Sequence, residues 1–274
     1  MKKAILTFLS ILLLQSCCFA LESAIKFVQV TDVHFEAKKP FKVKLLQETV
    51  KDINRLKDVS FVVFTGDNLN NPNPQDLNDF VKIINKLEVP YYLALGDHDV
   101  FKSKNLSKDQ YVEIVRNNNI FWFRREWNYS FKKKGYTFLV VDGAKEIIPG
   151  SVGYYRADTL EWLDKQLTKN SKRPVIILQH YPILDMKEFG SAKLKTHRTY
   201  QPEKYFEILD KHKNVLAVLS GHFHVNCEEM RNGVYHISTP TLLGEPYQYK
   251  IIDIISKEGL SPIIYTQLKE VEVE

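Results

Sequence analysis

The sequence predicts an α/β protein in which two β-sheets pack together and helices cover the outside. Three observations lead to this fold class. Short β-branched segments alternate with amphipathic ones in the first part of the 274-residue chain, a hairpin pattern lies in the middle, and the tail reads as consecutive strands. No Ser/Gly linker, low-complexity tract or solenoid-length repeat interrupts the sequence, so we expect one large domain.

The first part of the domain has a strand–helix–strand–helix–strand rhythm. Apolar, β-branched runs predict strands at 24–30, 60–65 and 90–95. Apolar residues at helical spacing predict helices at 42–57 and 74–87. Alternation of this kind is typical of a parallel or mostly parallel sheet with helices on its faces.

The second part mixes a hairpin with further strands and helices. Residues 128–143 predict a hairpin that turns near Lys134 and Gly135, and residues 158–170 predict a helix with Asp158 as its N-cap. The remaining predicted elements are a strand at 174–180, a helix at 201–212, and strands at 214–222, 233–240, 249–255 and 262–268.

The N-terminus has the pattern of a secretory signal peptide, which we assign to residues 1–20, leaving 21–274 for the folded domain. Lys2 and Lys3 are followed by an apolar stretch that is too short to span a bilayer as a helix. We therefore expect an exported protein, either periplasmic or membrane-anchored in a bacterium.

Two processing signals compete at the end of this leader. "LQSC" resembles a bacterial lipobox, in which Cys17 would carry a lipid and become the mature N-terminus. "CFA", ending at Ala20, instead fits cleavage by signal peptidase I. A lipid on Cys17 is the only membrane contact that we expect from the sequence.

Composition limits the other partners. The chain is 44% hydrophobic and 26% charged, which is ordinary for a globular protein with a large core. Its net charge of +5 falls to +3 when Lys2 and Lys3 leave with the signal peptide, so we expect no nucleic-acid partner. Two of the three cysteines lie in the leader region, so Cys227 is expected to have no disulfide partner.

Acidic and imidazole side chains follow five of the predicted strands. In an α/β sheet the carboxyl ends of the strands converge on one crevice, so we expect these side chains to meet there. A glycine directly before Asp67, Asp97 and His222 allows the backbone to approach closely. The full set is Asp32 and His34; Asp67; Asp97, His98 and Asp99; His180; and His222 and His224.

The spacing within two of these motifs favours a metal site. Asp32 and His34 are two residues apart, as are His222 and His224, so on an extended segment each pair would share one face. Imidazole and carboxylate ligands together suit Mn²⁺, iron, Zn²⁺ or Co²⁺ better than Ca²⁺.

The ordered set Asp-x-His, Gly-Asp, Gly-x-His-Asp, His and Gly-His-x-His resembles the calcineurin-like metallophosphoesterase superfamily over residues 25 to 240 or so. The segments "EWLDKQL" and "VLAVLSGHFHVN" are similar to the bacterial branch that contains cyclic-nucleotide phosphodiesterases. The resemblance implies a four-layer αββα sandwich, with two mixed β-sheets flanked by helices.

The resemblance also implies the roles of the polar residues around two divalent metal ions (Mn²⁺, Fe²⁺ or Fe³⁺, Zn²⁺ or Co²⁺). Two such ions would stabilise the phosphoryl oxygens and activate the attacking water. His98 would lie beside the substrate phosphate as an acid or transition-state donor, and Asp99 would either orient the His98 ring or cap a turn. The implied metal ligands are Asp32, His34 and His224 for one ion, Asp67 as the bridge, and Asp97, His180 and His222 for the other.

Asp97 departs from the family pattern, which usually has Asn at this position. An ionised Asp97 adds a third negative charge to those of Asp32 and Asp67. We expect it to bind metal more tightly, to weaken the Lewis acidity of the ions and to favour the charged form of His98.

The sequence therefore predicts an exported, dinuclear metal-dependent phosphoesterase that acts on a small phosphomonoester or phosphodiester. The alternative is a metal-holding exported lipoprotein of the same fold with little or no turnover. Monoester or diester preference, the natural ester and the oligomeric state stay open at this point.

Overall fold

The structure is a computed structural model that describes residues 23–273 except 105, 120–125, 186–197 and 258–259. The expected signal peptide, with Cys17 and Cys18, lies outside the described residues. Among the helices that are described, none is long and apolar enough to cross a bilayer. Cys227 is buried and makes no disulfide within the described part of the chain.

The first sheet has five strands in the order β11-β10-β1-β2-β3. β1, β2 and β3 run parallel, as the alternating pattern predicted, while β10 and β11 add antiparallel strands beside β1. The strands are β1 (Ser23–Val30), β2 (Val59–Thr65), β3 (Tyr91–Ala94), β10 (Gln248–Ser256) and β11 (Ile263–Glu270).

The second sheet has six strands in the order β4-β5-β6-β7-β9-β8. β5, β6, β7 and β9 are parallel, and the outer strands β4 and β8 are antiparallel to their neighbours. The strands are β4 (Tyr129–Lys133), β5 (Tyr136–Val140), β6 (Val175–Leu178), β7 (Val215–Ser220), β8 (Cys227–Arg231) and β9 (Val234–Ser238).

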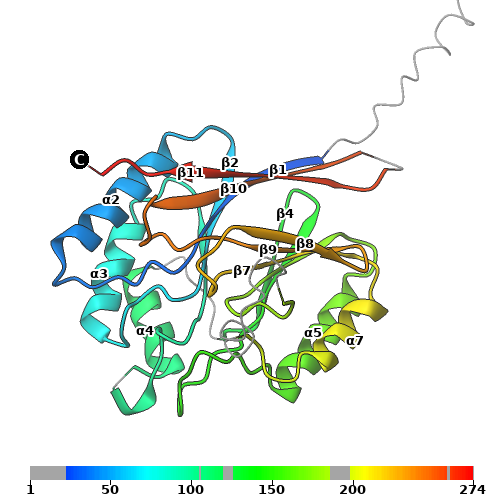
Figure 1. The fold of residues 1–274 in the computed structure, drawn as a ribbon, viewed down its shortest axis with the longest axis horizontal. Helices are drawn as coiled ribbons and strands as arrows, with labels where there is room; N and C mark the ends of the chain where they lie inside the picture. The colour runs from blue at the N-terminus through cyan, green and yellow to red at the C-terminus, as the bar shows by residue number, and fades with distance from the viewer. Residues whose placement is uncertain (1–22, 105, 120–125, 186–197, 258–259, 274) are drawn as a thin grey trace, which may run out of the picture.

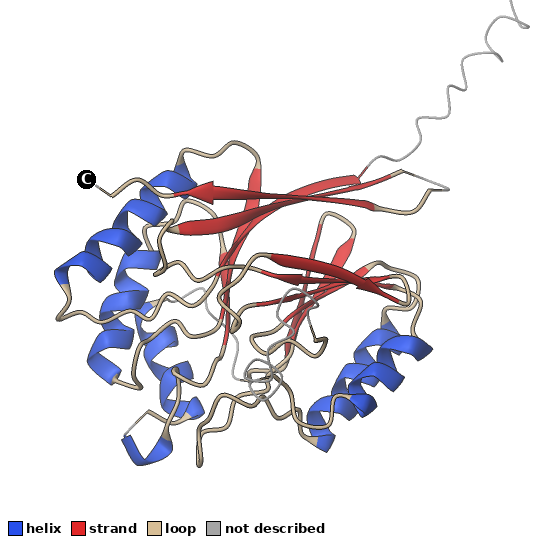
Figure 2. Ribbon diagram, viewed as in Figure 1, coloured by secondary structure: helices blue, strands red, loops and turns tan. Residues whose placement is uncertain are grey.

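Helices cover the outer faces of both sheets, which confirms the predicted αββα sandwich (Figures 1 and 2). Of the described helices, α2, α3 and α4 lie on the side of the first sheet, and α5 and α7 lie on the side of the second (Figure 1). They are α2 (Pro40–Asn54), α3 (Pro74–Ile84), α4 (Lys108–Asn118), α5 (Ala157–Lys169) and α7 (Glu203–Lys211), and a short 3₁₀ turn, η1, covers Lys102–Lys104.

Aromatic rings join the two sheets in the centre of the core. Phe61 of β2 stacks on Phe27 of β1 at 4.8 Å between ring centroids. From the second sheet, Phe138 and Phe131 meet the Phe61 ring edge-on at 4.9 and 5.3 Å. Edge-to-face contacts of this kind add to the hydrophobic burial that holds the sheets together.

Three elements differ from the sequence-based expectation. Helix α4 was not predicted, although Ser107 and Gln110 form a capping box at its start. Strand β8 was not predicted because only its first residue, Cys227, is buried, so apolar alternation is weak. The predicted N-cap of the helix at 158–170 was wrong by two residues: Arg156 is the N-cap, and Asp158 lies in the first turn, where its carboxylate accepts from the Arg156 guanidinium.

Candidate metal centre

The predicted ligands lie at the carboxyl ends of the parallel strands of both sheets. The structure brings seven of them into two neighbouring groups, and within each group the ligand atoms lie within 4.8 Å of one another; a third group of His34, Asp67 and His98 links the two. One group is Asp67, Asp97, His180 and His222, which follow β2, β3, β6 and β7; the other is Asp32, His34 and His224, which follow β1 and β7.

The backbone at these positions is not extended, so the expectation that each pair of residues shares one face of an extended segment is wrong. Asp32, His34, Asp67, His222 and His224 all have positive φ angles, between 45° and 66°. Tight left-handed turns just after the strands therefore direct these side chains, rather than alternation along one face, and His222 and His224 lie in different groups. A non-glycine residue in this region costs conformational energy, and such residues concentrate at functional sites.

The glycines beside the ligands are needed for close approach, as the sequence predicted. A Cβ on Gly221 would lie 2.0 Å from Thr31 Oγ1 and 2.4 Å from Asp32 Oδ2. A Cβ on Gly96 would lie 2.1 Å from Asp67 Oδ1. Only a residue without a side chain lets the turns touch here, between the two sheets at Gly221 and within the first sheet at Gly96.

Asp97 and His180 lie at the centre of the first group. His180 Nε2 is 3.5 Å from Asp97 Oδ1 and 3.4 Å from Asp67 Oδ2. His222 Nδ1 is 3.5 Å from the same Asp97 oxygen and 3.2 Å from His180 Nε2. Position 97, where the sequence departs from the family pattern, therefore lies among the ligands.

Asp67 connects the two groups. Its Oδ2, which approaches His180 on one side, lies 3.8 Å from His34 Nε2 on the other. In the second group, His224 Nε2 is 3.0 Å from Asp32 Oδ1 and 3.4 Å from His34 Nε2. A carboxylate between two ligand groups is the arrangement that the resemblance implied for a bridging ligand.

A backbone carbonyl sets the orientation of His180, a contact that no residue pattern in the sequence indicated. His180 Nδ1 donates to the Thr65 carbonyl oxygen at 2.9 Å, inside a fully buried environment. Because the proton of the neutral ring is on Nδ1, its lone pair is on Nε2, which faces the Asp67 and Asp97 carboxylates. A hydrogen bond on the far nitrogen is the usual support of a metal-binding histidine.

The electrostatics of the site favour added positive charge. Burial opposes a proton on His180, but the nearby Asp67 and Asp97 carboxylates hold its pKa well above the ordinary value. Burial would raise the pKa of Asp97, yet the His180 and His222 rings hold that pKa well below its usual range. Asp97 Oδ1 is also buried and accepts no hydrogen bond from the described residues.

These observations fit a divalent cation. Lone pairs of two carboxylates and two imidazoles point at one another at 3.2 to 3.5 Å, which is favourable only with a positive charge between them. Nitrogen and oxygen donors in this proportion suit Mn²⁺, iron, Zn²⁺ or Co²⁺.

His98 lies at the open side of the centre. Its ring Nδ1 donates to the Asn70 carbonyl at 2.7 Å, and its backbone N–H donates to Asp67 Oδ1 at 3.0 Å. The side chain is 43% exposed, so its Nε2 can reach a ligand from solvent. Burial opposes a charge, but Asp67 and the bond to Asn70 raise the pKa of His98 above the ordinary value.

Asp99 does not orient His98, contrary to the catalytic role that the sequence suggested. Its fully buried carboxylate accepts from the backbone N–H groups of Gly96 and Leu69 and from Asn68 Nδ2. Burial and the nearby Asp67 raise the pKa of Asp99 to about 7. Asp99 therefore closes the turn that carries Asp97, which is the capping alternative, and the Asn70 carbonyl orients the His98 ring.

Comparison with known proteins identifies the family. The model of the calcineurin-like phosphoesterase family matches residues 25–226. A 3',5'-cyclic-nucleotide phosphodiesterase of Nostoc is 24% identical over 224 residues, covering 79% of this chain and 78% of the relative. A probable glycerophosphodiester phosphodiesterase of Arcobacter nitrofigilis is 29% identical over 206 residues, covering 72% and 71%.

The fold also matches solved structures. A dimetal phosphatase from Danio rerio superposes with a TM-score of 0.64 at 15% identity, covering 89% of this chain and 99% of that one. Together with the family match, the strand-end motifs place the molecule in a defined class: the chain belongs to the calcineurin-like phosphoesterase family and is a metal-dependent phosphoester hydrolase.

Proposed function

We propose that this protein is an exported, dinuclear phosphodiesterase that cleaves a small phosphodiester outside the cytoplasm. The observation that carries the proposal is the position of Asp67, whose carboxylate lies between the two ligand groups. The diester preference is supported by the relatives, which are named cyclic-nucleotide and glycerophosphodiester phosphodiesterases.

Seven side chains would hold two divalent ions: Asp32, His34 and His224 the first, Asp97, His180 and His222 the second, with Asp67 shared. The ions, when bound, supply charge stabilisation at the phosphoryl oxygens and activation of the attacking water. Mn²⁺, iron, Zn²⁺ and Co²⁺ are the ions that we propose from the donor set.

His98 has the geometry to hold a proton at the leaving group. Asn70 fixes the ring through Nδ1, so Nε2 is the atom turned to the open side of the centre. Its raised pKa keeps a larger fraction of the ring protonated near neutral pH, which suits donation to a departing alkoxide. We assign His98 the role of general acid.

A nitrophenyl assay tests the proposal directly. The chelator-treated protein is supplied with Mn²⁺, Zn²⁺, Co²⁺ or Mg²⁺ and offered bis-p-nitrophenyl phosphate and p-nitrophenyl phosphate. We expect nitrophenol release that needs added metal and is faster from the diester. Asp67→Asn should abolish release, whereas Asp79→Asn, at a half-buried carboxylate of α3 that pairs with Lys82, should leave it unchanged.

Two outcomes of the assay contradict the proposal. Faster release from the monoester would replace the diesterase by a monoesterase. Metal binding without release from either ester would favour the alternative function, a metal-holding exported lipoprotein, for which the sequence of the leader is the supporting feature.

Export has its own test. The full chain is expressed in a bacterium and followed by fractionation, with Cys17→Ser as the variant that cannot be lipidated. We propose that the wild-type chain fractionates with the membrane and that Cys17→Ser moves it to the periplasm. Retention of both forms in the cytoplasm would contradict export.

A further inference from the structure

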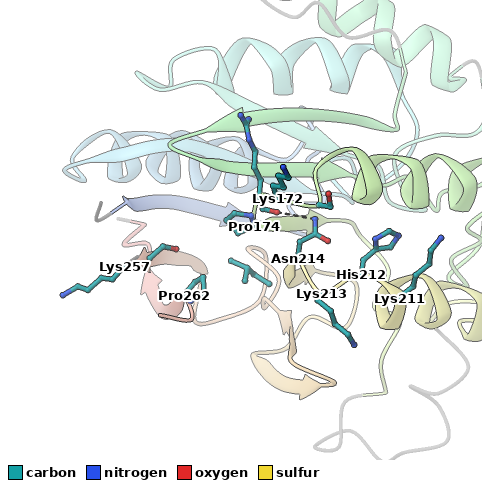
Figure 3. Close-up of a pocket in the computed structure, with 12 residues that line it drawn as sticks. Lys172, Pro174, Lys211, His212, Lys213, Asn214, Lys257 and Pro262 are labelled. Carbon is teal, nitrogen blue, oxygen red and sulfur yellow. Dashed lines mark hydrogen bonds between the residues drawn. The ribbon is translucent and has the colours of Figure 1, made fainter. Parts of the chain in front are cut away.

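A groove of about 1150 Å³ lies at the amino ends of β6 and β7 (Figure 3). Its walls include the loops that precede β6 and β7 and the segment that follows β10. The metal ligands His180 and His222 follow β6 and β7 instead. Because β6 and β7 are parallel, the groove and the metal centre lie at opposite ends of the same sheet.

The groove is basic. Among the described residues that line it there is no carboxylate, and Lys211, Lys213 and Lys257 extend away from its margins (Figure 3). Within the described residues, neither Lys172, Arg173 nor Lys213 has a carboxylate at ion-pair distance, while Lys211 is paired with Asp164. The cationic residues around the groove are Lys172, Arg173, Lys211, Lys213 and Lys257.

The basic surface continues onto the β4–β5 hairpin. Lys132 and Lys134 are exposed at its turn. Tyr136, at the start of β5, hydrogen-bonds through its hydroxyl to Ser256 Oγ, and Ser256 lines the groove. The hairpin and the groove therefore form one cationic face, which we call the basic face: Lys132, Lys134, Lys172, Arg173, Lys211, Lys213 and Lys257.

The leader joins the folded domain at this same end. Ser23, the first residue of β1, pairs with Ser256 at the margin of the groove. Cys17 precedes Ser23 by six residues, a reach of on the order of 20 Å for an extended chain. A lipid on Cys17 would thus hold the basic face, and not the metal centre, close to a bilayer.

We propose that the basic face docks on the anionic phospholipid surface of a membrane, with the metal centre directed away from it. Clustered lysines and arginines near a bilayer bind its negative surface potential, and they reinforce an attached lipid. A nucleic acid also carries the negative charge that these cations could bind. Binding to a nucleic acid would not explain why the leader joins the folded domain at the same end as the basic face. The proposal does not depend on which ester the metal centre cleaves.

Vesicle binding tests this proposal with the full chain carrying Cys17→Ser and Cys18→Ser, so that no lipid is attached. Binding to phosphatidylcholine vesicles is compared with binding to vesicles holding roughly 30% phosphatidylglycerol. We expect at least about tenfold stronger partitioning into the anionic vesicles. The double variant Lys172→Glu with Lys213→Glu should reduce partitioning into the anionic vesicles by at least about tenfold, since both lysines are exposed on the basic face.

The matched control is Lys44→Glu with Lys82→Glu, which makes the same change in net charge on exposed positions of α2 and α3. Equal partitioning into the two vesicle types, or equal loss in both double variants, would overturn the proposal. Tighter binding to a single-stranded oligonucleotide than to anionic vesicles would overturn it in favour of nucleic acid. Hydrolysis of bis-p-nitrophenyl phosphate is followed in parallel and should be the same in the parent protein and both double variants. A failure of membrane docking can therefore be distinguished from a failure of the proposed hydrolytic function.

Discussion

At the scale of single residues, Asp97 is the position where this metal centre differs from the pattern that it resembles. Its Oδ1 lies 3.5 Å from both His180 Nε2 and His222 Nδ1 and accepts no hydrogen bond from the described residues. The extra carboxylate lowers the net positive charge of a loaded centre. It should tighten metal binding and make the activated water less acidic.

Asp97→Asn should leave both metals bound and change the hydrolysis rate, or the ranking of Mn²⁺, Zn²⁺ and Mg²⁺, by about tenfold or more. The rate with each metal and the metal content of the purified protein are the measurements. Asp109→Asn, on an exposed carboxylate of α4, is the control. Unchanged kinetics with all three metals would remove Asp97 from the ligand set.

At the scale of elements, the tight turns after the strands carry the centre. Gly221 follows β7, and its Cα faces Thr31 and Asp32 at the end of β1 in the other sheet. A side chain there must displace Asp32, whose Oδ2 accepts from Thr31 Oγ1 at 2.7 Å and from the His222 N–H at 3.0 Å.

Gly221→Ala should therefore lower activity by about a hundredfold and reduce metal content, because a shift of about 1 Å in a catalytic group has an effect of that size. Gly150→Ala is the matched control, since its new Cβ would meet only Lys145 Nζ at 3.7 Å. Full activity and full metal content in Gly221→Ala would show that the turn can yield without moving Asp32.

Strand β2 also holds the two sheets together through Phe61, which is fully buried among rings from both. Phe61→Ala should reduce the free energy of unfolding by about 3–5 kcal/mol, the usual effect of removing a large buried ring. Urea unfolding measures it. The same substitution at Phe41, which is 44% exposed, should change it by less than about 1 kcal/mol, and equal effects at both positions would contradict this account of the core.

At the scale of the whole molecule, stability should depend on pH through His236. This residue of β9 is buried and its Nε2 has no hydrogen-bond partner in the described structure. Burial, with a smaller effect from Arg231, lowers the pKa of His236 to about 4. The unfolded chain takes up a proton on this ring below the ordinary histidine pKa of 6.5 and the folded protein does not, so stability falls as the pH falls from about 6.5 to about 4.

His236→Leu removes this titration. Between pH 7 and pH 4 the metal-free wild type should lose about 3 kcal/mol more stability than the variant, the free energy that a pKa difference of this size represents. Unfolding in denaturant at several pH values measures the difference. If the free energy of unfolding fell equally with pH in the two proteins, His236 would be protonated in the folded protein as readily as in the unfolded chain.

The overall arrangement also separates two surfaces. Ligands follow the carboxyl ends of β1, β2, β3, β6 and β7, while the amino ends of β6 and β7 and the start of β1 border the basic face. A protein held to a membrane by the basic face would keep its metal centre open to dissolved esters.

Much of this molecule could be predicted from the order of its residues. Alternating apolar segments indicated the two sheets, because a strand or helix that buries one face must repeat its apolar residues with its own period. Helix α4 was missed although Ser107 and Gln110 carry a capping signal, and β8 was missed because an edge strand with one buried residue leaves little apolar pattern.

The order of residues was enough to show which chemical groups follow the strands, and therefore the family and the kind of metal ligand, since ligand type is a property of the side chain alone. How those groups are held depends on the folded arrangement. Positive φ angles at Asp32 and His34, the Thr65 carbonyl behind His180 and the separation of Asp99 from the His98 ring all arise where turns of different strands meet. Contacts between segments far apart in the chain depend on three-dimensional packing, and no local pattern of residues encodes them.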